Sequence, residues 1–183
     1  MPITVEQARS IAQQELLLIG EDKFCLQIDQ IEEFDVGWVF HYQADRFLET
    51  GSGDEMLVGA APIFVSRSDG KPAFVSYHRT LEESISAYRA CGDISAHQVP
   101  ALHLLGGREG ASAMQAIQAI RKHSSYGIEQ AKALISSCLS GHVHVIELPS
   151  MEATVALLLA LASAGFDAEI GYSVPRKTGV NVS

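Results

Sequence analysis

The chain has 183 residues, of which 47% are hydrophobic and 19% charged, and its mean hydropathy is +0.12. This composition is too apolar for a disordered chain and too often interrupted by polar residues for a membrane protein. The longest near-apolar run, Ala153 to Ala162, is about half as long as the ~20 residues of a bilayer span, and no export signal opens the chain. We therefore expect a soluble, cytoplasmic protein of one large or two small domains.

The net charge of −9 is distributed unevenly. Residues 1–98 hold 7 basic and 16 acidic residues, whereas residues 99–183 hold 6 of each, so the excess lies in the first half. An acidic surface repels nucleic acid and anionic lipid and attracts basic partners. We expect no nucleic-acid or membrane partner; the charge indicates either a cationic protein partner or solubility alone.

The first half predicts the order α-β-β-β-β-α. Thr4 and Gln7 form a capping box, and apolar residues recur at helical spacing until Gly20. Thr80 and Glu83 form a second capping box before a helix that ends near Gly92. Alternating or continuous apolar residues predict strands between these helices. The strands are expected at 24–31, 37–42, 62–65 and 73–77.

The second half predicts the order β-α-α-β-α-β. Two helices marked by Met114 and Leu134 follow a short strand at 101–105. A strand at 142–148 precedes a third helix capped by Ser150, and a strand at 166–172 completes the pattern. The fold class is therefore α+β, with an antiparallel sheet in the first of two small domains.

Residues 92–100 show no periodicity and coincide with the change in charge, so we expect a linker there. The predicted organisation is an acidic domain at 1–91, the linker at 92–100, a second domain at 101–173 and a flexible tail at 174–183.

The first half resembles the immunity protein 35 family of bacterial polymorphic toxin systems, also called YrhB-like, over residues 3–90. The motifs that carry the resemblance are Gly37-Trp38-Val39-Phe40-His41-Tyr42, Phe47-Leu48-Glu49-Thr50-Gly51, Met56 to Val65 and Ser68-Asp69-Gly70. The resemblance implies a protein that binds a toxin and needs no catalysis.

The second half resembles the C-terminal domain of the bacterial ribosomal stalk protein over residues 101–172. The resemblance is carried by Ala119-Ile120-Arg121, Gly127 to Ile135 and Ala164 to Ile170. It implies an interaction face on two consecutive helices, at which Arg121 and Lys132 stand at matching basic positions. Most of that family's lysines are replaced here, so we expect an interaction module rather than a ribosomal protein.

We find no arrangement of residues that predicts catalysis or a cofactor. His142 and His144 share one strand face without a third metal ligand, and solvent-facing histidines that alternate with Val143 and Val145, expected to be buried, explain the spacing more simply. The carboxylates at 32–35 and 54–55 lie in polar stretches, which favours a solvated rim over an acid/base pair. The cysteines, Cys25, Cys91 and Cys138, are too far apart for a metal, redox or disulfide motif. We expect neither an enzyme, nor a metal, nor a cofactor.

The candidate partner-binding residues surround the loop at 45–55 and are Tyr42, Asp45, Glu49, Asp54 and Glu55. Trp38 and Phe40 are expected in the core, whereas Tyr42 ends the aromatic stripe and is expected to be more accessible, although a core position is the alternative.

The leading hypothesis is a bacterial immunity protein that binds and neutralises a cognate, basic toxin by steric and electrostatic blocking. The alternative is a translation-associated or chaperone-like adaptor that acts through the second domain. The sequence leaves the oligomeric state and the toxin's identity open.

Overall fold

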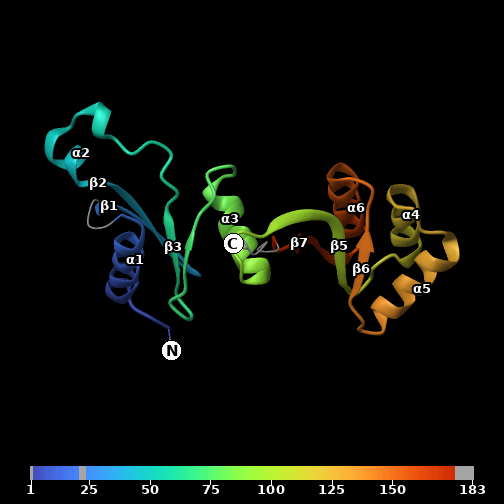
Figure 1. The fold of residues 1–183 in the computed structure, drawn as a ribbon. Coiled ribbons are helices and arrows are strands. Elements are labelled where there is room, and N and C mark those ends of the chain that lie inside the picture. Colours follow the sequence, from blue (N-terminus) through green and yellow to red (C-terminus); the bar gives the residue numbers. More distant parts are fainter. Residues whose placement is uncertain (1, 21–23, 176–183) are drawn as a thin grey trace, which may run out of the picture. The chain divides into compact units, whose positions relative to one another are not determined.

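The computed structural model describes residues 2–20 and 24–175. The chain divides into two compact units, Met1–Ala96 and His97–Ser183. Each unit holds one antiparallel sheet together with helices, which confirms the α+β prediction (Figure 1).

The first unit contains a four-stranded antiparallel sheet in the order β1-β2-β3-β4. Its strands are β1 (Phe24–Phe34), β2 (Gly37–Ala44), β3 (Ile63–Ser66) and β4 (Pro72–Phe74). The number of strands is as predicted, but β1 extends three residues beyond the expected end at Ile31. The register between β1 and β2 shifts between Leu26 and Ile31, so the pairing of the two strands is irregular there.

Two helices of the first unit begin at the predicted caps. Before α1 (Val5–Gly20), the Gln7 side chain accepts a hydrogen bond from the Thr4 backbone N–H, and the Gln7 backbone N–H donates to Thr4 Oγ1. Thr80 and Glu83 exchange the same two bonds at the start of α3 (Leu81–Cys91). These bonds satisfy backbone donors that have no partner inside a helix.

The sheet of the first unit is covered on both faces. One core cluster joins Ala8, Ala12 and Leu16 of α1 to alternate residues of β2 and β3. A second cluster joins Ile85 of α3 to Val39 and Phe64, which point to the opposite face. Both faces of β2 are therefore buried, and Trp38, Val39 and Phe40 are each at most 2% exposed.

The connection from β2 to β3 contains two short helices that the sequence did not predict. They are α2 (Asp45–Thr50) and the 3₁₀ helix η1 (Gly53–Glu55). Gly51 ends α2 in the left-handed conformation, with φ of 66°, and its N–H donates to the Phe47 carbonyl. We call residues 45–57 the acidic excursion.

The second unit contains a three-stranded antiparallel sheet in the order β6-β5-β7. The predicted element order, β-α-α-β-α-β, is confirmed. The elements are β5 (His97–Gly107), α4 (Ala113–His123), α5 (Ile128–Leu139), β6 (His144–Glu147), α6 (Met151–Ser163) and β7 (Phe166–Ser173). All three helices contribute to one core with the strands, and Ser150 caps α6 as expected.

The segment expected as a linker is largely ordered. Ile94 and Ala96 are 3% and 0% exposed, and the Arg79 guanidinium donates hydrogen bonds to both of their carbonyls. β5 begins at His97, four residues before the expected strand start at Ala101. Within the expected tail at 174–183, residues 176–183 lie outside the described part of the chain.

Candidate partner-binding site

Tyr42 belongs to the core of the first unit. Its side chain is 9% exposed, and its ring lies 5.9 Å from the ring of Phe24, centroid to centroid. Burial raises the pKa of the phenol. Tyr42 is more exposed than Trp38 (2%) and Phe40 (0%), as expected, but it too takes the core position named as the alternative, because α1 covers the face of β2 to which all three side chains point.

The structure brings the four predicted acidic residues together in the acidic excursion. Asp45 and Glu49 belong to α2, and Asp54 and Glu55 to η1. Glu55 accepts a hydrogen bond of 2.7 Å from Thr50 Oγ1, which ties η1 to the end of α2. Arg46 is the single basic residue at 45–55; its Nε lies 3.5 Å from Glu55 Oε1, and its side chain is 82% exposed. The excursion therefore keeps a negative balance.

Gln43 holds the two ends of the acidic excursion together, which the sequence did not predict. Its Oε1 accepts hydrogen bonds from the backbone N–H groups of Ala44 and Leu57, and its Nε2 donates to the Leu57 carbonyl at 3.2 Å. The Gln43 side chain is 6% exposed. A buried amide that uses both its donor and its acceptor in this way fixes the local backbone.

Cys25, near the start of β1, lies beside the acidic excursion. Phe24 pairs with Ala44, and Cys25 pairs with Gln43, so β1 begins beside the start of α2. The pKa of the exposed Cys25 thiol is raised, first by its hydrogen bond with the Asp45 carboxylate, then by partial burial, and then by the negative charges of Asp45 and Glu49. The negative charges of Asp45 and Glu49 therefore lie close to the start of β1 as well as on α2.

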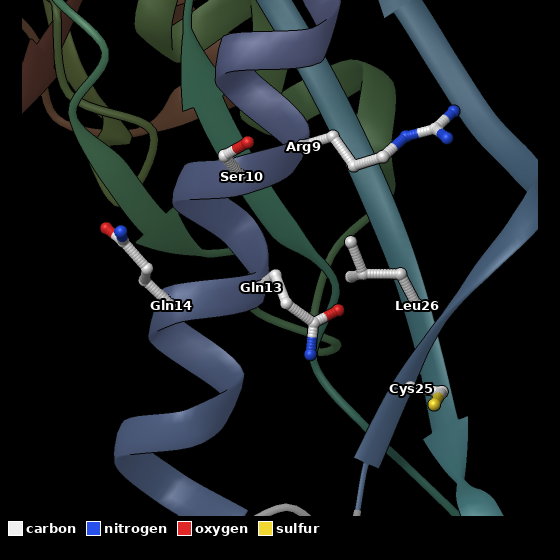
Figure 2. A pocket seen from close by; sticks show the side chains of 6 residues that line it. All are labelled: Arg9, Ser10, Gln13, Gln14, Cys25 and Leu26. Atoms are coloured by element: carbon white, nitrogen blue, oxygen red, sulfur yellow. The ribbon is translucent and has the colours of Figure 1, made fainter.

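A groove of about 470 Å³ lies between α1 and β1. Its lining residues are Arg9, Ser10, Gln13, Gln14, Cys25 and Leu26. Figure 2 shows the Arg9 side chain extending from α1 toward the strands and the Leu26 side chain pointing back toward the helix. Because Cys25 contributes both to the groove and to the contact with Asp45, the groove and the acidic excursion are neighbours.

The carboxylates singled out at 32–35 each lie beside a basic side chain at the surface. Glu32 Oε1 lies 3.0 Å from His41 Nε2, and Arg67 pairs with Glu33. The Arg89 guanidinium beside Asp35 lowers the pKa of that carboxyl. The three carboxylate side chains are each more than half exposed, so each has a partner at the surface and they do not form a buried acid/base pair.

The basic residues predicted for the second unit lie on consecutive helices. Arg121 is exposed in the last turn of α4, and Lys132 is exposed on α5, where its Nζ lies 3.0 Å from Glu129 Oε1. His144 has a buried Nε2 with no hydrogen-bond partner among the described residues. Within residues 2–20 and 24–175, the structure gathers no group of three or more His, Cys, Asp or Glu side chains suited to a metal ion.

No helix in the described part of the chain combines the length and the apolar character that a membrane crossing requires.

Comparisons with known proteins concern the first unit. Residues 6–89 match the family model of immunity protein 35. The chain is 34% identical over 55 residues to a protein described as "Uncharacterized protein YrhB" of Escherichia coli (strain K12), and this match covers 30% of the chain and 58% of the relative. No solved structure matches. The comparisons give no support to the stalk-like resemblance of residues 101–172. They show that the first unit is similar to immunity protein 35.

Proposed function

We propose that this protein is a bacterial immunity protein that binds a cognate toxin in the cytoplasm and neutralises it by covering its active site. The observation that carries the proposal is the match of residues 6–89 to immunity protein 35. No chemical step by this chain is required, because occlusion of the toxin suffices.

The acidic excursion is the surface we propose for the first contact with the toxin. Asp45, Glu49, Asp54 and Glu55 share one connection held at its ends by Gln43, and Arg46 is the only base among residues 45–55. Clustered charge of one sign accelerates the association of an oppositely charged partner. The proposed partner is therefore a basic toxin, and Tyr42 supports the site from the core.

The proposal is tested by co-expressing the protein with the toxin domain encoded beside its gene. The full chain should restore growth and form a complex with the purified toxin. Replacing Asp45, Glu49 and Asp54 by Asn or Gln should mainly slow association and weaken its salt dependence, because the exposed charges of Glu49 and Asp54 contribute about 1 kcal/mol or less each. The matched control replaces Glu82, Glu129 and Glu152, which are exposed on helices outside the excursion.

Co-purification distinguishes this proposal from the adaptor alternative. A single basic polypeptide supports an immunity protein, whereas ribosomes or elongation factors would support an adaptor that uses Arg121 and Lys132. Failure of the full chain to bind or neutralise the toxin would contradict the proposal.

A further inference from the structure

The two edges of the first sheet differ in how well they are protected. β4 has three residues and begins with Pro72, which has no N–H to offer a neighbouring strand. β1 has eleven residues and contains neither proline nor a basic residue. Proteins commonly block sheet edges with short strands, proline or lysine. β1 has none of these three devices. Its protection lies beyond Leu26, where the register shifts and Glu32 and Glu33 add charge, so the run Phe24–Leu26 remains an unblocked edge that is regularly paired with β2.

No other backbone segment among the described residues pairs with the outer side of β1. The groove between α1 and β1 lies along this edge, with Leu26 and Cys25 on the strand side and Arg9 and Gln13 on the helix side. Side chains alternate between the two faces of a strand. A strand added to β1 would therefore direct every second side chain toward α1 and the groove.

The charged residues around the edge of β1 indicate which kind of strand could pair with it. β1 contains acidic residues and no basic ones, so pairing β1 with β1 of a second copy would bring like charges together. Asp45 and Glu49 add negative charge at the Cys25 end of the same edge. Arg9 disfavours a basic side chain inside the groove itself. These features favour an extended segment that alternates apolar side chains, which face the groove, with basic side chains, which face the acidic residues.

We propose that the edge of β1 from Phe24 to Leu26, together with the α1–β1 groove, binds an extended cationic segment of the partner protein as an added β-strand. The proposal rests on the proposed function and specifies how the toxin is held. Backbone hydrogen bonds to β1 supply affinity, and the groove and Asp45 supply specificity.

The first test uses the full chain and an end-capped peptide of alternating Lys and Val, eight residues long. Amide hydrogen exchange should slow in β1, and alkylation of Cys25 should slow about tenfold when 90% of the protein is bound. Cys91, exposed at the end of α3, provides the internal control and should react at an unchanged rate. A Glu/Val peptide and a peptide with proline at alternate positions should have neither effect. Equal effects from these peptides, or no slowing in β1, would overturn the proposal.

The second test uses the toxin itself. Cys25→Lys places a positive charge at the proposed edge and should raise the Kd for the toxin about tenfold. Phe74→Lys makes the matched change at the other edge, where Phe74 is 39% exposed, and should leave the Kd unchanged. Circular dichroism checks that both variants fold.

The outcomes separate this proposal from the proposed function. If the wild-type chain neutralises the toxin and Cys25→Lys binds it equally well, strand addition is wrong while the immunity function stands. If the wild-type chain does not bind the toxin but the peptide protects β1, the immunity function fails and the strand-binding edge remains. Protection of β1 that grows with protein concentration in the absence of peptide would indicate self-pairing and would also overturn the proposal.

Discussion

The Asp45 carboxylate raises the pKa of the Cys25 thiol. A hydrogen bond to the carboxylate and its negative charge both disfavour the thiolate, which raises the pKa of the thiol. Asp45→Asn removes the charge, so the pKa should fall and more thiolate should be present at a given pH below it. Because the thiolate is the reactive form, alkylation of Cys25 at pH about 8 should be faster in Asp45→Asn than in the wild-type protein.

The alkylation experiment contains its own reference. Cys91 lies outside this contact and should react equally fast in both proteins, and a Cys25→Ser variant assigns the signal. An unchanged rate at Cys25 would show that Asp45 does not act on the thiol.

Tyr42 illustrates how burial and binding can be confused. Because its ring packs against Phe24 in a core that α1 closes, Tyr42→Ala should lower the free energy of unfolding by about 3–5 kcal/mol, as for other large aromatic truncations. Tyr42→Phe keeps the ring and should retain most of that stability. Urea denaturation measures both. A Tyr42→Ala variant of unchanged stability that nevertheless loses the toxin would contradict the core assignment.

Among the helices and strands, those whose position depends on neighbouring residues in the sequence were predicted correctly. Capping boxes at Thr4 and Thr80 located α1 and α3, and alternation located β2. The alternation of apolar side chains in β2 did not predict that both faces of this strand are buried. That burial depends on where α1 and α3 pack against the sheet. α2 has only six residues and no full amphipathic repeat.

The start of β5 was missed for a similar reason. Pro100 lies where the register between β5 and β7 shifts, between Gln98 and Leu102. Proline in a strand marks an edge or a bulge, so its presence favoured a loop at this position. The candidate site shows the same limit: the acidic residues were visible in the sequence, whereas Gln43 and the groove depend on tertiary contacts.

Gln43 provides the element-scale prediction. Gln43→Ala removes the acceptor of the Ala44 and Leu57 N–H groups and the donor to the Leu57 carbonyl. The acidic excursion should loosen, so that the Leu57 amide exchanges at least about tenfold faster, given that a lost buried partner costs about 1–3 kcal/mol. Thr80→Ala is the control, because it weakens the cap of α3 by about 1 kcal/mol without touching the excursion. Equal exchange of Leu57 in both variants would contradict the role of Gln43.

For the whole molecule, paired carboxylates predict acid sensitivity. Lys71 and Ser66 lower the pKa of Asp69 to about 2, and Arg89 and Arg108 lower those of Asp35 and Asp167. The unfolded chain then binds more protons than the folded one between about pH 4 and pH 2, so stability should fall as the pH falls through this range. Urea denaturation at several pH values should show the decline, and Asp69→Asn should make it shallower. Equal stability at about pH 5 and pH 2.5 would contradict the assignment.

The two units are expected to fold independently, and the first unit is expected to bind the toxin. Among the residues that the structure describes, the core clusters of the first unit contain none beyond Ile94, and the core cluster of the second unit begins at Leu102. We expect the fragments 1–96 and 97–183 each to unfold cooperatively. The fragment 1–96 carries the excess negative charge and the match to immunity protein 35. It should therefore bind the toxin with the association rate and the salt dependence of the full chain. Circular dichroism on heating and binding kinetics on both fragments measure this. If both fragments fold but 97–183 alone binds as tightly as the full chain, the inhibitor is the second unit, and the charge of the first unit serves solubility.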